Sequence, residues 1–113
     1  MYTLIHQDKN SKARLGRITT PHGDFDTPAF MPVGTHATIK GLMFKDVVDA
    51  GAQIMLSNAY HVYLKPGVGI IKKAGGLHKF MSWDKPILTD SGGYQVFSLA
   101  LFRKMHDAGV EFQ

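Results

Sequence analysis

The sequence contains no cysteine, and this absence excludes several kinds of chemistry. These 113 residues cannot form disulfide bonds, thiolate zinc sites or iron–sulfur clusters, and they contain no thiol nucleophile. A basic segment followed by an apolar core is missing at the amino terminus, so no signal peptide is expected. The longest nearly apolar run covers residues 96–102, whereas a membrane-spanning helix needs about 20 residues. We therefore expect a cytoplasmic chain without a membrane partner.

Charge of one sign is only slightly in excess. Thirteen Lys and Arg oppose nine Asp and Glu, which gives a net charge of +4 at pH 7. Such an excess is compatible with a nucleic-acid partner, although it more often serves solubility. Five lysines, with Trp83 among them, fall in one stretch: Lys65, Lys72, Lys73, Lys79 and Lys85. They could contact phosphates, as in a small basic RNA-binding module, or form a solvated lysine face.

The chain divides into two regions by its pattern of turns and apolar residues. Residues 1–28 predict an antiparallel β cover, with extended runs over 2–7, 13–20 and 25–27 and a Pro-Gly turn at 21–24. Residues 29–113 alternate short apolar strands, expected at 29–33, 53–57 and 86–89, with helical spacing near 44–51 and 68–74. Residues 109–113 read as the start of another strand.

Alternating strands and helices predict an α/β fold with a parallel sheet. Three such strands amount to about three-eighths of a (β/α)₈ TIM barrel, which typically takes about 250 residues. A chain of 113 residues is too short to close that barrel. We therefore expect the first βα units of a larger, incomplete fold, and so a fragment.

The sharpest local feature follows the third expected strand. Asp90, Ser91, Gly92, Gly93 and Tyr94 come directly after it, and Gln95 adds an amide. Sites in parallel sheets form at the carboxyl ends of strands, so Asp90 is placed to touch a ligand. The two glycines allow a ligand to approach the backbone, and the Tyr94 ring can stack. Alternatively, Asp90 caps the next helix with help from Ser91.

Two further loops follow expected strands. Asn58 and His61 could line the same mouth as Asp90, although a satisfied turn explains His61 more simply. The loop at residues 34–38 is most simply a plain turn. The sequence does not contain a dinucleotide-binding fingerprint, because Lys72 takes the place of its third glycine. A zinc site is not expected either, because the six histidines show no i, i+4 pair.

Several stretches occur in an order that resembles the amino-terminal part of tRNA-guanine transglycosylase, also called queuine tRNA-ribosyltransferase. They are ARLGR (13–17), TPAFMPVGT (27–35), KG (40–41), NAYH (58–61), PG (66–67) and LTDSGGYQVFSL (88–99). The resemblance covers nearly the whole chain. Gly93 is typical of the bacterial or eukaryotic branch. Ser57 and Ala59 depart from the Gly and Thr that usually flank the residue matching Asn58.

The resemblance implies a transferase, more narrowly a pentosyltransferase, of tRNA queuosine biosynthesis. Such an enzyme exchanges guanine at the anticodon wobble position of tRNA for queuine or its 7-deazaguanine precursor. The matching Asp90 would be the acid/base group; Ser91, Gly92, Gly93 and Tyr94 would contact the base, and Asn58 would support the pocket. The fold implied is an irregular TIM barrel, and the full-length family implies a homo- or heterodimer.

The resemblance also implies parts that lie later in the family than these residues. Glycosidic cleavage commonly uses two carboxylates, and this chain offers no convincing partner for Asp90. The nucleophilic Asp and a zinc site of cysteines and a histidine belong to the missing carboxyl-terminal part, so no cofactor is expected in this chain. We do not expect turnover from the chain alone, and a non-catalytic fragment or binding subunit of the family is the alternative.

Overall fold

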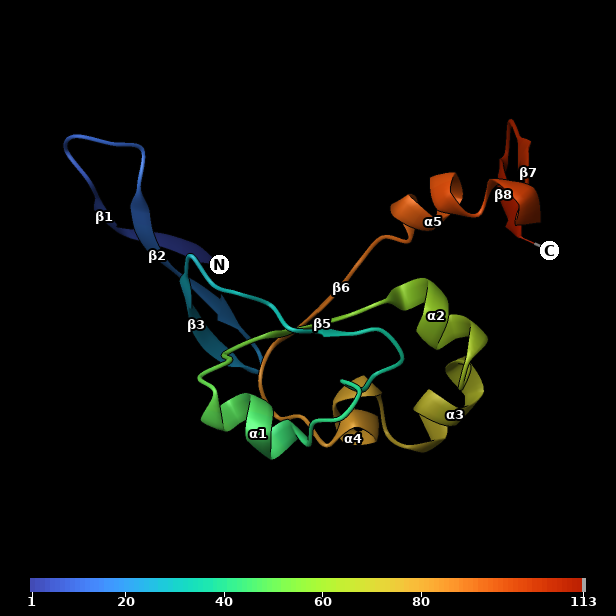
Figure 1. Cartoon of the computed structure of the whole chain (residues 1–113), viewed down its shortest axis with the longest axis horizontal. Coiled ribbons are helices and arrows are strands. Elements are labelled where there is room, and N and C mark those ends of the chain that lie inside the picture. Colours follow the sequence, from blue (N-terminus) through green and yellow to red (C-terminus); the bar gives the residue numbers. More distant parts are fainter. Residues whose placement is uncertain (113) are drawn as a thin grey trace.

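The computed structural model describes residues 1–112, which form an elongated molecule of 49 × 33 × 26 Å. An amino-terminal antiparallel sheet and a carboxyl-terminal hairpin lie at opposite ends, and a parallel sheet with its helices lies between them (Figure 1). Within these residues, no helix is long and apolar enough to cross a membrane.

The first sheet is antiparallel and has β2 at its centre. Its strands are β1 (Tyr2–Gln7), β2 (Arg14–Thr20) and β3 (Gly23–Thr27). The β2–β3 turn is closed by the pair Thr20 and Gly23, and Gly23 has a φ of 109°, which a residue without Cβ adopts readily. The three predicted extended runs are confirmed as strands of this sheet.

The second sheet is parallel, and its strands follow chain order: β4 (Val33–Gly34), β5 (Met55–Ser57) and β6 (Ile87–Thr89). The strand expected over 29–33 is wrong in extent, because only Val33 and Gly34 join the ladder. Pro32 has no N–H, and its carbonyl oxygen accepts a single hydrogen bond from the Leu56 N–H at 2.9 Å. The two sheets and their helices confirm a mixed α/β fold.

Short helices fill the connections of the parallel sheet. They are α1 (Phe44–Asp49), α2 (Ala59–Leu64), α3 (Val68–Lys73), α4 (Leu77–Met81) and α5 (Gly93–Ser98). Helix α1 joins β4 to β5, and α2, α3 and α4 all lie between β5 and β6. The sequence spacing predicts α1 and α3 but not α2 and α4.

The carboxyl-terminal part leaves the parallel sheet. After α5 come a 3-10 turn, η1 (Ala100–Phe102), and an antiparallel hairpin of β7 (Arg103–His106) and β8 (Gly109–Phe112). The strand expected at 109–113 is present up to Phe112, and Gln113 lies outside the described residues. Strand β8 pairs with β7 and not with the parallel sheet, because the turn at Asp107 and Ala108 folds the chain back.

The core lies between the helices and one face of the parallel sheet. Met55 points into it from β5, together with Ala37, Val47, Met81 and Trp83. The Trp83 indole Nε1–H donates a hydrogen bond to the Pro86 carbonyl oxygen at 3.1 Å, so its polar atom is satisfied inside the core. This packing fixes where β5 and β6 end, and therefore where the residues that follow them lie.

Candidate functional site

Asp90 and Asn58 lie at the carboxyl ends of neighbouring parallel strands. Asp90 follows β6 and Asn58 follows β5, and the paired residues Ser57 and Thr89 bring them side by side. The Asn58 side-chain amide donates a hydrogen bond to Asp90 Oδ2 at 2.5 Å. The backbone N–H of Ala59 donates to Asp90 Oδ1 at 2.7 Å. The structure thus joins the two loops that the sequence singles out.

Asn58 is the N-cap of helix α2 as well as the partner of Asp90. Its side-chain oxygen accepts a hydrogen bond from the His61 backbone N–H at 3.0 Å, while its amide nitrogen faces the carboxylate. The Asn58 side chain is buried. Each end of this amide therefore has its own partner, which fixes its orientation and, through it, the position of the half-buried Asp90 carboxylate.

The alternative that Asp90 caps the next helix is wrong. Helix α5 begins after Gly92, which has a φ of 71° and forms no side-chain cap. Ser91 does contribute locally, since its Oγ accepts a hydrogen bond from the Gly93 N–H at 3.2 Å. The glycine pair therefore turns the chain from β6 into α5 and leaves the Asp90 carboxylate directed at α2.

Helix α5 presents an aromatic and an amide in different environments. The Tyr94 side chain is 76% exposed, so its ring is free to stack on a flat ligand. Gln95 is only 6% exposed, and its Oε1 has no hydrogen-bond partner among the described residues. The sequence marks the amide of Gln95, but it does not reveal that Gln95 would be buried with a free acceptor.

Three ring side chains gather on the segments that follow β4 and β5. His36, from the loop after β4, and His61, on α2, have ring centroids 5.2 Å apart at an interplanar angle of 57°. The Tyr60 ring meets His61 edge-on, with centroids 5.5 Å apart. Sequence reasoning favours simple turns for both loops, and no sequence signal pairs the two histidines.

The lysine-rich stretch at residues 65–85 does not form a joint surface with the tryptophan that lies within it. Lys65, Lys72, Lys73 and Lys79 are exposed, and Lys85 is partly exposed. Trp83 is buried in the core against Phe44, with ring centroids 5.9 Å apart, and is not available to a ligand. The aromatic that the sequence places among these lysines therefore belongs to the fold.

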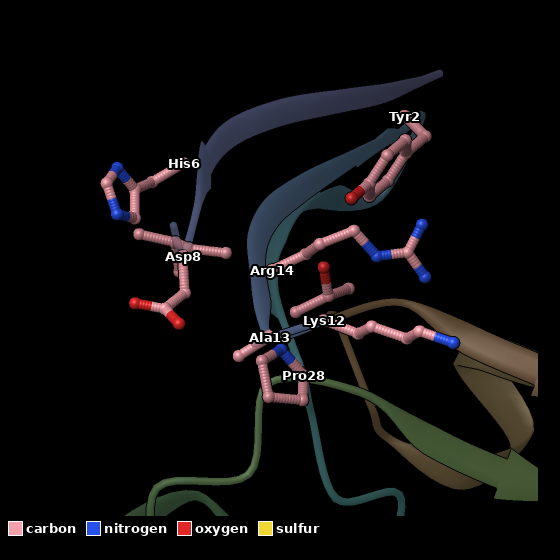
Figure 2. Close-up of a pocket in the computed structure, with 9 residues that line it drawn as sticks. Tyr2, His6, Asp8, Lys12, Ala13, Arg14 and Pro28 are labelled. Atoms are coloured by element: carbon pink, nitrogen blue, oxygen red, sulfur yellow. The ribbon is translucent and has the colours of Figure 1, made fainter. Parts of the chain in front are cut away.

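A further cavity lies elsewhere, in the antiparallel cover. It measures about 820 Å³ and runs along β1 and β2 towards Pro28 (Figure 2). In Figure 2 the Lys12 and Arg14 side chains point away from His6 and Asp8, so its polar groups do not converge as those of a ligand site do. Asp8 is instead tied to its own turn, where hydrogen bonds from Ser11 and Asn10 lower its pKa.

The described residues also provide no metal site. No group of three or more His, Cys, Asp or Glu side chains gathers within residues 1–112. Structural zinc requires four such ligands. The side chains present therefore do not fit zinc.

Comparison with known proteins places this geometry in context. The sequence profile of the family described as queuine tRNA-ribosyltransferase matches residues 8–113. A queuine tRNA-ribosyltransferase of Desulforudis audaxviator is 58% identical over the whole chain, which covers 30% of that protein. Those of Lysinibacillus sphaericus and Acetivibrio thermocellus are 59% and 60% identical over 99% of the chain, which covers 29% and 30% of them. The chain thus spans about 30% of the length of these curated relatives.

Proposed function

This chain belongs to the queuine tRNA-ribosyltransferase family, and on that premise we propose that it carries the acid/base half of a base-exchange site. The reaction is the replacement of guanine at the wobble position of tRNA by queuine or its 7-deazaguanine precursor. The observation that carries the proposal is the Asp90 carboxylate, held at a strand end by Asn58 and the Ala59 N–H.

The hydrogen bonds at Asp90 leave it suited to a purine-like base. An ionised carboxylate accepts about four hydrogen bonds, and Asn58 and Ala59 supply two of them. The remaining acceptor positions can take N–H donors of guanine, which has several along one edge. Tyr94 on the same connection offers an exposed ring to stack on the base, and the backbone of Ser91, Gly92 and Gly93 borders it.

A second carboxylate is needed for the complete reaction. Breaking the bond between base and ribose through a covalent intermediate uses one carboxylate as nucleophile and another to move a proton. We assign the proton transfer to Asp90 and place the nucleophile, and the zinc site of the family, outside these residues. The dimer implied by the family stays a prediction, and a tRNA substrate agrees with the expected cytoplasmic location.

The architecture proposed for the complete fold is a (β/α)₈ barrel. Strands β4, β5 and β6 follow chain order in one parallel sheet with helices between them, as consecutive barrel strands do. Residues 1–28 would form the antiparallel cover and residues 29–113 the first βα units. The curated relatives are more than three times as long, which leaves room for the remaining units.

Binding of the free base tests the role of Asp90 directly. Guanine and a 7-deazaguanine are titrated into the chain and followed by calorimetry or amide chemical shifts. Replacing Asp90→Asn removes charge-assisted acceptors and is expected to weaken binding by about 10-fold or more. Asp24→Asn, on the remote cover strand β3, is the matched control. Equal affinity of Asp90→Asn and the unsubstituted chain would remove Asp90 from the pocket.

A turnover assay distinguishes a site that exchanges bases from a fragment that only binds them. Labelled guanine is offered together with unmodified tRNA, and incorporation of the label is followed. We expect base binding without measurable exchange, because we place the nucleophile outside these residues. Exchange by the 113 residues alone would show that the chain itself contains the second catalytic group.

A further inference from the structure

We propose that His36 and His61 form a phosphate-binding site at the mouth of the base pocket, which holds a backbone phosphate next to the wobble nucleotide. The inference rests on the proposed function, because it takes the polynucleotide to be the ligand. Its structural basis is the pairing of the two imidazoles, whose ring centroids are 5.2 Å apart.

The fold places both histidines at the same edge of the parallel sheet as Asp90. His36 follows β4, His61 lies on the helix after β5, and Asp90 follows β6. His61 is also coupled to the carboxylate through one residue, since its backbone N–H is bound by Asn58, which in turn donates to Asp90. The histidine pair therefore belongs to the same end of the sheet as the proposed pocket.

The turn that carries His36 is held by buried neighbours. The Ala37 N–H donates to the Gly34 carbonyl oxygen at 3.0 Å, and Ala37 has a φ of 60°, in the left-handed region. The Ala37 side chain packs in the core with Met55. A non-glycine residue keeps such a φ only where its surroundings fix it, and here the buried methyl group does so while His36 stays exposed.

The chemistry of the pair favours an anionic oxygen over a metal ion. The rings are tilted by 57° and are not stacked face to face, and His36 is exposed while His61 is partly exposed. No third ligand joins them in a group of metal-binding side chains within the described residues. Histidine donates hydrogen bonds when neutral or protonated, and phosphate oxygens accept them strongly.

A phosphate is what the proposed reaction would bring to this place. A base that enters a pocket from a folded RNA must leave the stack, which swings its sugar and the flanking phosphates to the mouth of the pocket. Contacts to those phosphates fix the register of the nucleic acid without reading its sequence. His36 and His61 would therefore act as positioning residues for the nucleotide whose base meets Asp90.

The test uses an RNA hairpin with the anticodon loop of a cognate tRNA, whose binding to the chain is followed by fluorescence anisotropy. The double variant H36Q/H61Q is expected to bind about 10-fold more weakly, as for the loss of a hydrogen bond to a charged group. His6→Gln, an exposed histidine on β1, is the control and should behave as the unsubstituted chain.

A chemically altered RNA makes the assignment specific. Neutral methylphosphonate groups replace, one at a time, the phosphates on either side of the wobble nucleotide. If the histidines bind one of them, that RNA should bind the unsubstituted chain and H36Q/H61Q equally. The single variant His36→Gln serves as a second probe, because its exposed side chain leaves the core unchanged, and it should show part of the loss.

Other results would overturn the phosphate site. H36Q/H61Q binding the hairpin with unchanged affinity would do so, as would the absence of RNA binding by the unsubstituted chain. Guanine binding, measured in parallel, reports on the base pocket separately. If guanine binds but the phosphate site fails its test, the proposed function still stands. If neither guanine nor the phosphate binds, both proposals are refuted.

Discussion

Asn58 has two roles, and most other residues could serve only one of them. Its carbonyl oxygen caps helix α2 at the His61 N–H, and its amide nitrogen donates to Asp90. An aspartate would retain the cap but lose the donor, and an alanine would lose both. The neighbouring Ala59 contributes only its backbone N–H to Asp90, so the departure from threonine at this position leaves that hydrogen bond available.

Substitutions at Asn58 should separate these two roles. Asn58→Ala is expected to lower the free energy of unfolding by about 1–2 kcal/mol, through loss of a helix cap and of a buried hydrogen bond. Asn58→Asp keeps the cap but sets a second carboxylate against Asp90, so its loss should be larger at pH 7 than near pH 4. Urea unfolding at both pH values measures this difference.

The exposed loop offers a matched control for these variants. Asn10→Ala, in the β1–β2 turn, should change stability by less than about 0.5 kcal/mol. An Asn58→Asp variant with the same loss at both pH values would contradict the contact between residues 58 and 90.

At the scale of elements, the sequence predicts the strands and the two helices that end at glycines better than the helices that end at other residues. Gly51 and the pair Gly75 and Gly76 mark the ends of α1 and α3, and their positive φ values agree with that role. Helix α2 is as long as α1 and α3 and has a good N-cap in Asn58, but it ends at Lys65, in an extended conformation, and not at a glycine. Pairing between strands determines how the elements are arranged relative to one another.

In the candidate site, the positions of single residues can be predicted from the sequence, but the contacts between them cannot. The position of Asp90 after an apolar strand is readable from sequence, and so is that of Asn58. Their contact depends on the register of β5 against β6, which places Ser57 opposite Thr89. The ladders of β4, β5 and β6 contain only two or three residue pairs, which is too short a pattern to predict that register, or the His36–His61 pair, from the sequence.

The antiparallel cover meets the helical layer through two stacked histidines. His22, in the β2–β3 turn, lies on His78 of α4 with ring centroids 3.5 Å apart and an interplanar angle of 13°. Burial lowers the pKa of His78, and the positive charge of His22 lowers it further, which the backbone of Lys85 only partly offsets. Neutral rings can stack closely, whereas two protonated rings repel.

This stack predicts a loss of stability in mild acid. Because the pKa of folded His78 lies below its ordinary value of 6.5, the unfolded chain binds a proton first as the pH falls. Stability is therefore full above that value and decreases as the pH drops from 6.5 towards the lowered pKa. We therefore expect Tm to decrease through this contact as the pH falls, measured by thermal unfolding from pH 7.5 to 5.5.

Replacement of either ring checks the origin of the effect. His78→Gln should remove this part of the pH dependence, and His22→Gln should reduce it. His6→Gln, on the exposed strand β1, should leave the dependence unchanged. Identical pH profiles for His78→Gln and the unsubstituted chain would assign the acid sensitivity to other groups.

The whole molecule exposes far more surface than a compact domain of its size. Its accessible surface is 8306 Å², compared with about 6,200 Å² expected for a folded monomer of this mass. Its radius of gyration is 17.0 Å, compared with about 13 Å for a compact domain of this length. The excess includes one face of the parallel sheet, where the paired residues Val33, Leu56 and Leu88 align.

That sheet face is covered at one end only. Phe25 of the cover and Ile54 are buried where the cover meets the sheet, and they line a cavity of about 350 Å³ together with Leu88. Further along, Val33 is 54% exposed and Leu88 is 38% exposed. Apolar residues on an uncovered face beside unpaired strand edges favour association with other chains.

The uncovered face predicts that the chain self-associates in solution. Light scattering coupled to gel filtration should give a mass that rises with concentration from micromolar to millimolar. Leu88→Lys places a charge on this face and should shift association to concentrations at least about tenfold higher. Leu4→Lys is the matched control, because Leu4 is 48% exposed but lies on the remote cover strand β1. A monodisperse monomer at every concentration, with a sharp cooperative melting transition, would show instead that the 113 residues form a self-sufficient domain despite their open sheet.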